Sequence, residues 1–331
     1  MRSRPRRNRR SPAVRALVRE ALVRPDQLVH PLFLLPGENR REGIDHLAGY
    51  PRLSADAAER EIDELLALGV RSFIAFPAVP DERKDRTAGF GASPDNFYLH
   101  AARRWKERYP EITLVSDVAM DPYSVDGHDG LVEGGRILND ETLPILAAMA
   151  VAQAEAGFDY LGPSDMMDGR VGYLRDALDA AGHAETGIIS YTAKYASAFY
   201  GPFRQALDSA PREGGEAPTH KRSYQMDPAN RREALREARL DAEEGADVLM
   251  VKPALHYLDV VSDLRVNSAL PVACYHVSGE CAMLLGAVER GWLAEEAIAE
   301  TVTCLGRAGA DVIITYVARR YVAQYERLVL G

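Results

Sequence analysis

The chain has 331 residues and a formal net charge of −9, and 47% of its residues are hydrophobic and 27% charged. This composition is typical of a soluble globular protein, and the length suits one large α/β barrel or two smaller domains. The negative charge argues against nucleic-acid binding by the whole surface, and the sequence has no apolar run long enough to span a membrane.

The three cysteines, Cys274, Cys281 and Cys304, have neither the spacing of a disulfide framework nor that of a zinc site. They lie among apolar residues, so we expect buried, reduced thiols. Such thiols favour a reducing compartment and therefore a cytoplasmic location.

Residues 1–27 are predicted to form a basic N-terminal arm. Six of the first ten residues are arginine, and the segment that follows is too charged for a secretory signal. Such an arm binds nucleic acid or an anionic surface, or it wraps around a neighbouring subunit. We favour the subunit contact.

Residues 28–331 are predicted to form the catalytic domain, which starts with alternating strands and helices. The expected elements are a strand over 28–35, a helix that Ser54 caps and Gly69 ends, a strand over 71–77, a loop over 78–94, a helix over 97–109 and a strand over 112–118.

One local pattern then recurs. Gly69, Gly157, Gly245 and Gly309 each follow a helical pattern and precede a short apolar run, which is typical of the αβ turn in a parallel fold. The apolar runs at 187–191 and 270–275 bring the strand candidates to eight. Because no Gly-x-Gly-x-x-Gly follows the first strand, the pattern favours a TIM (β/α)8 barrel over a dinucleotide-binding fold.

Two of the predicted strands end on a lysine. The apolar run over 248–251 leads to Lys252 and then Pro253, and the run from Gly187 leads to Lys194. Active sites of parallel barrels lie at these strand ends, and two ammonium groups in one pocket push one amine toward its neutral form. A neutral lysine beside a second cation is the arrangement that a Schiff-base enzyme needs. The alternative is a strand-end lysine that only reaches solvent.

The segment at about 201–222 is predicted to be an irregular, basic lid over this pocket. Its prolines and glycines disfavour regular structure, and it carries Arg204, Arg212, Lys221 and Arg222. A basic lid over a lysine pocket suits a substrate with a carboxylate and a carbonyl group. The alternative is a solvated basic loop.

Long motifs resemble those of the porphobilinogen synthases, also called 5-aminolevulinate dehydratases. The motifs are Ser164-Asp-Met-Met-Asp-Gly-Arg-Val171, Lys194-Tyr-Ala-Ser-Ala-Phe-Tyr-Gly-Pro-Phe-Arg204, Tyr224-Gln-Met-Asp-Pro-Ala-Asn-Arg-Arg-Glu-Ala234, Met250-Val-Lys-Pro-Ala254 and Tyr275-His-Val-Ser-Gly-Glu280. The resemblance covers essentially the whole chain.

The resemblance implies an enzyme that condenses two molecules of 5-aminolevulinate to porphobilinogen, with loss of water, in tetrapyrrole synthesis. Lys252 and Lys194 would both form Schiff bases, with Lys252 as the principal nucleophile. Arg204 and Lys221 would bind one substrate carboxylate, with Arg222 as the alternative to Lys221. Ser278 and Tyr316 would bind the other carboxylate.

Many relatives bind zinc through three cysteines in the segment that corresponds to 117–129. Ala119, Asp121 and Asp129 stand at those positions here, so the chain resembles an aspartate-rich branch, and we expect no active-site zinc. Asp117, Asp121 and Asp129 are expected either to bind Mg²⁺ or K⁺ transiently or to hydrogen-bond substrate. His128, a lone histidine in a polar loop, is expected to be solvated.

The resemblance also implies an allosteric Mg²⁺, bound largely through water, at Glu237. Asp227 is expected to cap the helix that carries this glutamate. The alternative is an exposed carboxylate that is paired with Arg232, Arg236 or Arg239. The family also implies a homo-octamer, with a hexamer as the alternative, and neither nucleic-acid nor membrane partners.

Two other functions remain to be compared. A class I aldolase would carry a glycine-rich phosphate site after the last two strands, where Val277-Ser-Gly-Glu-Cys281 offers one glycine. A non-catalytic tetrapyrrole-binding or scaffold protein would explain neither lysine's position.

Overall fold

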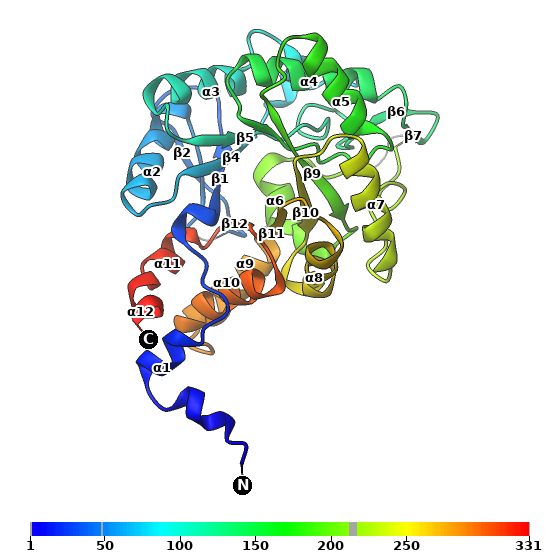
Figure 1. Ribbon diagram of the computed structural model, residues 1–331. Coiled ribbons are helices and arrows are strands. Elements are labelled where there is room, and N and C mark those ends of the chain that lie inside the picture. Colours follow the sequence, from blue (N-terminus) through cyan, green and yellow to red (C-terminus); the bar gives the residue numbers. More distant parts are fainter. Residues whose placement is uncertain (1, 48, 212–216, 331) are drawn as a thin grey trace.

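The computed structural model describes residues 2–47, 49–211 and 217–330, and a closed barrel of parallel strands lies at its centre (Figure 1). In these residues the barrel strands are β1 (Leu28–Leu34), β4 (Ser72–Pro77), β5 (Thr113–Val115), β8 (Tyr160–Leu161), β9 (Gly187–Lys194), β10 (Val248–Lys252), β11 (Val272–His276) and β12 (Val312–Thr315). They follow chain order around the barrel, and β12 pairs with β1 to close it. The eight predicted strands and the TIM barrel are confirmed.

Helices surround the barrel (Figure 1). The larger ones are α2 (Ala55–Ala67), α3 (Phe97–Arg108), α4 (Leu143–Glu155), α5 (Arg170–Ala180), α7 (Arg232–Glu243), α8 (Leu258–Asn267), α9 (Ser278–Glu289) and α10 (Glu296–Ala308). The glycines of the recurring αβ turn, Gly69, Gly157, Gly245 and Gly309, have φ angles of 88°, 97°, 100° and 119°. Because side chains disfavour this left-handed region, a glycine is required where each of these helices turns into a strand.

Short elements decorate the strand ends. β2 (Arg41–Gly43) pairs with β3 (Pro51–Leu53), which extends the sheet beside the C-terminal half of β1, and β6 (Leu131–Glu133) forms a hairpin with β7 (Arg136–Leu138). Within the described residues, no helix is both long and apolar enough to cross a membrane.

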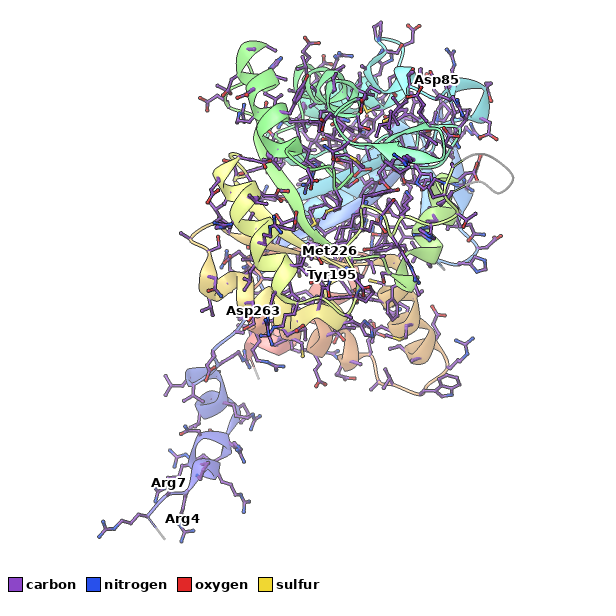
Figure 2. The ribbon with its side chains drawn as sticks, turned by 90° about the vertical axis from the view of Figure 1, so that its right-hand side faces the viewer. Arg4, Arg7, Asp85, Tyr195, Met226 and Asp263 are labelled. Atoms are coloured by element: carbon purple, nitrogen blue, oxygen red, sulfur yellow. The ribbon has the colours of Figure 1, made fainter. Side chains whose placement is uncertain are left out.

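The predicted arm lies apart from the barrel. It contains a 3-10 helix, η1 (Pro5–Arg9), and a short helix, α1 (Pro12–Leu17), and no side chain of residues 2–22 is buried. Figure 2 shows Arg4 and Arg7 on this extension, at a distance from the barrel. The chain joins the core at Val23, whose carbonyl oxygen accepts a hydrogen bond from Tyr321 of α11 (Ala318–Val322) near the C-terminal helix α12 (Tyr325–Leu330).

Of the two predicted helix caps, Ser54 is confirmed in position only and Asp227 is wrong. Ser54 is the N-cap residue of α2, but its hydroxyl accepts from the backbone N–H of Arg40 and not from a helix N–H, so it ties a loop to the helix. Asp227 lies five residues before α7, and its carboxylate accepts from the N–H of Ala229. A short polar side chain can hydrogen-bond the backbone two residues on in a turn as readily as at a helix start.

The lid is also more regular than predicted. Residues Gly201–Leu207 form a helix, α6, with Pro202 in its first turn. Proline is compatible with this position because its missing N–H would have no helical partner there. Residues 212–216, which include Arg212, lie outside the described residues.

Of the three cysteines, Cys274 and Cys281 are buried as predicted, whereas Cys304 is partly exposed. All three are free thiols. The prediction failed for Cys304 because it lies on the helix α10, where a residue whose sequence neighbours are apolar can still face away from the core.

Candidate active site

The two lysines lie side by side at the C-terminal end of the barrel. Lys194 is the last residue of β9 and Lys252 the last residue of β10, and the two are direct partners in the parallel register. Their relative exposures are 5% and 6%. The structure therefore places two amines in one buried pocket, as the sequence predicted.

An irregularity in β9 brings Lys194 to the pocket. Between the pairs Leu249↔Ser190 and Val251↔Ala193, β9 uses one more residue than β10. Successive strand residues face opposite sides, so an extra residue reverses the facing of every residue after it. Thr192 faces outward, toward the helices, and Lys194 faces the pocket because the bulge lies between Ser190 and Ala193.

Aromatic rings surround the Lys252 ammonium. Its Nζ lies 4.6 Å from the ring centroid of Tyr275, 4.9 Å from that of Tyr191, 5.0 Å from that of Phe203 and 5.4 Å from that of Tyr200. Among the described residues, this Nζ has neither a hydrogen-bond acceptor nor an ion-pair partner within the usual distances. Burial and then the neighbouring charge of Lys194 lower the pKa of Lys252 to about 7.

Lys194, by contrast, is well partnered. Its Nζ donates to the Ser164 carbonyl oxygen and lies 3.2 Å from Asp129 Oδ1. The other carboxylate oxygen, Asp129 Oδ2, lies 2.8 Å from Lys221 Nζ and accepts a 2.9 Å bond from the Tyr224 hydroxyl. Asp129 is fully buried, and the two lysines hold its pKa well below the ordinary value although burial alone would raise it. The pocket thus contains one lysine that is anchored by a carboxylate and one lysine that is easily neutralised.

Asp117 and Asp121 complete the pocket from the segment after β5. Asp121 Oδ2 lies 3.1 Å from Lys221 Nζ. Burial, and next the charge of Asp121, raise the pKa of Asp117 to about 7, although Lys252 opposes this rise. Asp117 therefore exchanges a proton near neutral pH.

The prediction for His128 is wrong. Its side chain is fully buried, with Nδ1 3.0 Å from the Tyr224 hydroxyl and Nε2 2.7 Å from the Pro218 carbonyl oxygen. Burial is the main reason why its pKa is lowered. His128 joins the segment after β5 to the end of the lid, a contact that only the tertiary structure creates.

The lid residues line a pocket of about 240 Å³. Its lining includes Arg204 of α6 together with Lys221 and Arg222 from the lid's other end. Lys221 is buried and paired with two carboxylates, whereas Arg222 is exposed. Both cations border this pocket, so the geometry leaves Arg222 beside Lys221 as a candidate carboxylate ligand. Beyond the lid, the backbone of Met226 pairs with that of Tyr195, and Figure 2 shows the two residues together.

Tyr316 follows β12 directly, and Ser278 lies two residues after the end of β11, at the start of α9. The Ser278 hydroxyl accepts a 3.0 Å hydrogen bond from the backbone N–H of Phe203, and the Tyr316 hydroxyl lies 3.0 Å from that of Tyr275. Phe203 and Tyr275 are two of the rings around Lys252. The structure therefore brings both predicted carboxylate ligands to the Lys252 side of the pocket.

Glu237 lies away from this pocket, on α7, and is half-buried. Burial raises its pKa, and the nearby carboxylates of Asp241 and Asp168 add to that rise. In the described part of the chain it forms no ion pair with Arg232, Arg236 or Arg239, the alternative that its sequence neighbours suggested.

Among the described residues, no group of three or more His, Cys, Asp and Glu side chains is arranged to hold a metal ion. Asp129, one of the candidate ligands, is instead shared between Lys194 and Lys221. A Mg²⁺ at Glu237 would take its remaining ligands from water, which this ion tolerates because it dehydrates reluctantly.

Replacing Asp129 with asparagine is expected to lower the free energy of unfolding by roughly 3–5 kcal/mol, because two buried ammonium groups lose their shared counter-ion. Urea titration at neutral pH measures this loss. The control is Asp126→Asn, which removes a carboxylate 3.9 Å from a half-exposed arginine and should cost less than about 1 kcal/mol. Similar losses in the two variants would contradict this account of Asp129.

Several residues around the lysines were not singled out from the sequence as parts of the site: Tyr191, Tyr200, Phe203, Tyr224 and Tyr275. They come from four separate segments, so no spacing signal joins them. The density of tyrosine and phenylalanine near both lysines was the available signal.

The fold and the site define a TIM-barrel enzyme with a pair of buried lysines at the ends of two neighbouring strands. The delta-aminolevulinic acid dehydratase family matches this sequence over residues 2–324. The chain belongs to that family and is a lyase.

Individual relatives agree with this assignment. The chloroplastic delta-aminolevulinic acid dehydratase of Chlamydomonas reinhardtii is 51% identical over 95% of this chain and 82% of its own length. The Chlamydia pneumoniae enzyme is 46% identical over 95% of this chain and 94% of its own. The Toxoplasma gondii enzyme, solved with its reaction product porphobilinogen, superposes with a TM-score of 0.94 at 46% identity and covers 98% of this chain and 91% of its own. These matches favour this family over the class I aldolases and over a non-catalytic protein.

Proposed function

We propose that this enzyme condenses two molecules of 5-aminolevulinate to porphobilinogen, with loss of water, through Schiff bases on Lys252 and Lys194. The observation that carries this mechanism is the pairing of the two lysines at the ends of β9 and β10, one with a pKa of about 7 and the other held by Asp129. Family membership supports the substrate and product.

The first step uses the neutral amine of Lys252. Its nitrogen attacks the ketone carbon of one substrate, and loss of the carbonyl oxygen as water leaves an iminium ion. This cation withdraws electrons from the neighbouring carbon, which then loses a proton. That carbon bonds to the C=N carbon of the second substrate on Lys194, and the electron pair of this double bond moves to the Lys194 nitrogen. The aromatic rings around Lys252 exclude water and stabilise the positive charge that develops.

Lys194 holds the second ketone as its own Schiff base, which makes the condensation effectively intramolecular. Asp117 is suited to accept and return protons during these steps, because its pKa of about 7 lets it do both near neutral pH.

The two substrate carboxylates are assigned to opposite sides of the pocket. Arg204 and Lys221, with Arg222 as the alternative second cation, would bind one of them under the lid. The hydroxyls of Ser278 and Tyr316 would bind the other beside Lys252. Asp121 and Asp117, from the segment after β5, would hydrogen-bond the substrate.

The test is reduction with borohydride in the presence of 5-aminolevulinate, followed by peptide mapping. We expect an adduct at Lys252, and the rate of trapping should rise as the pH passes through about 7. The sign follows because only the neutral amine attacks, and the neutral form predominates above the pKa of Lys252. A parent enzyme that is active without any adduct at Lys252 would refute the mechanism.

We further propose that the active site works without zinc and that a Mg²⁺ ion, bound at Glu237 mostly through water, regulates assembly. Aspartates and alanine in the segment after β5 support the first part, since hard carboxylates do not build a tight zinc site. Glu237 lies on α7, outside the barrel and away from the lysine pocket, which supports a regulatory role for the ion instead of a chemical one.

Chelation of zinc should accordingly leave kcat largely intact, whereas removal of magnesium should lower activity or shift the size of the oligomer. Light scattering and steady-state assays measure the two effects. Glu237→Gln should abolish the response of oligomer size to added magnesium. Full loss of activity with a zinc-selective chelator would contradict the proposal.

The assembly itself is proposed to be a homo-octamer, or alternatively a hexamer, in which the arm contacts a neighbouring barrel. The exposed apolar side chains of the arm, such as Leu17 at 83%, support such a contact. A cytoplasmic location is proposed from the three free thiols.

A further inference from the structure

A buried polar cluster lies behind β9, on the side of the barrel wall that faces the helices. It consists of Arg170 at the start of α5, Asp241 near the end of α7, and Ser190 and Thr192 of β9. The exposures of these residues are 2%, 2%, 0% and 0%. None of them reaches the pocket that holds the two lysines, so the proposed chemistry leaves this cluster without a role.

Asp241 is the centre of the cluster. Its Oδ2 accepts hydrogen bonds from the Ser190 hydroxyl at 2.6 Å and from the Thr192 hydroxyl at 2.8 Å. The Arg170 guanidinium binds both carboxylate oxygens, with Nη1 at 3.4 Å from Oδ1 and Nη2 at 3.3 Å from Oδ2. One carboxylate therefore holds two hydroxyls of the same strand and one cation from a helix.

Arg170 also reaches the backbone between those hydroxyls. Its Nη2 donates to the carbonyl oxygen of Tyr191 at 3.4 Å and to the Ser190 hydroxyl at 3.1 Å. Asp241 and Arg170 together contact three consecutive residues, 190–192. Bonds of this kind define both the facing of the side chains and the direction of one backbone carbonyl.

These three residues include the bulge of β9. Lys194 follows two positions after Thr192, and in a regular strand those two residues would face the same side. The extra residue between Ser190 and Ala193 is what makes Thr192 face Asp241 while Lys194 faces Lys252. A strand without the bulge would carry Lys194 out of the pocket.

We propose that Asp241 and Arg170 are positioning residues that hold the β9 bulge and thereby set the orientation of Lys194. The inference rests on the proposed function, because it assigns Lys194 a Schiff base. A buried ion pair is a poor source of net stability, since packed apolar side chains often serve as well. The ion pair does impose a single geometry on its hydrogen-bond partners. A bulge that lies two residues before a reacting lysine requires such a single geometry.

The test compares Thr192→Val, which removes one hydroxyl without changing the shape of the side chain, with Thr192→Ser, which retains it. Asp241→Asn removes the charge and is expected to fold, because Asp165 Oδ2 lies 3.9 Å from Arg170 Nε as a second counter-ion. The matched control is Asp247→Asn. Asp247 Oδ2 accepts from the N–H of Ile188 at the start of the same strand, before the register shift that follows Ser190.

Each variant is reduced with borohydride and 5-aminolevulinate, and the adducts at Lys194 and Lys252 are quantified separately beside kcat, KM and the melting temperature. For Thr192→Val and Asp241→Asn we expect a selective loss of the Lys194 adduct and a fall in kcat of roughly 10- to 100-fold, as for a reacting group displaced by about 1 Å. Thr192→Ser, which keeps the hydroxyl, should form the Lys194 adduct at the parental level. Asp247→Asn should match the parent.

The inference is overturned if the Lys194 adduct persists at the parental level in Asp241→Asn and Thr192→Val. It is also overturned if both adducts fall in parallel with the melting temperature, because a general loss of folded protein explains that result. A parent enzyme that forms no adduct at Lys252 refutes the proposed function instead, so the two failures are distinguishable.

Discussion

Replacing Lys252 with methionine is expected to lower kcat by roughly 10⁴- to 10⁶-fold, as when other covalent nucleophiles are removed. Methionine has a similar length and suits the ring-lined wall around Lys252, so the barrel should fold. Steady-state assays and circular dichroism measure activity and fold in parallel.

Lys252→Arg is the matched control for charge. Arginine stays protonated, so it should be nearly as inactive as methionine, which separates the need for a neutral amine from the need for a cation. In both variants we expect no adduct at position 252 after borohydride reduction. A Lys252→Met enzyme that retains a tenth or more of the parental kcat would rule out Lys252 as the principal nucleophile.

Replacing Lys194 with methionine is expected to have two effects. The rate should fall on the order of 10³-fold or more, because the second ketone is no longer held next to the first. The pKa of Lys252 should rise, since the charge of Lys194 is, after burial, the strongest influence that lowers it. The rate of borohydride trapping at Lys252 should therefore increase with pH only above the parental midpoint of about 7.

Lys194→Arg separates these two effects. It retains the positive charge opposite Asp129, so the pH dependence of trapping at Lys252 should stay near that of the parent. The amine is lost, so the rate should fall as in Lys194→Met. If the two variants show the same shift in pH dependence, the charge of Lys194 is not what keeps the pKa of Lys252 low.

Most of the architecture was predictable because local signals determine it. Glycine at 69, 157, 245 and 309 is required by positive φ angles at the ends of helices, and the apolar runs after these turns became buried strands. Lys252 and Lys194 end two of those strands, so a parallel barrel must bring them to the same rim.

The errors share one cause, which is that a polar side chain has several possible partners. The side chain of Ser54, although it stands at the N-cap position of α2, binds loop backbone, and Asp227 does so five residues before its predicted helix. His128 is buried because Tyr224 and Pro218, about 90 residues later in the chain, provide its partners. Sequence distance says nothing about such contacts, and an apolar or polar neighbourhood in sequence does not determine burial.

The sequence by itself determined the barrel, the two lysines at neighbouring strand ends, and the family. Only the tertiary structure decided which lysine is easily neutralised. Lys252 lies among aromatic rings, whereas Lys194 and Lys221 share the buried carboxylate of Asp129. The side of β9 on which Lys194 lies was likewise decided by the tertiary structure, through the bulge between Ser190 and Ala193. The physical reason is that desolvation and ion pairing depend on groups from distant segments, and one extra residue in a strand reverses a side chain without any signal in the apolar pattern.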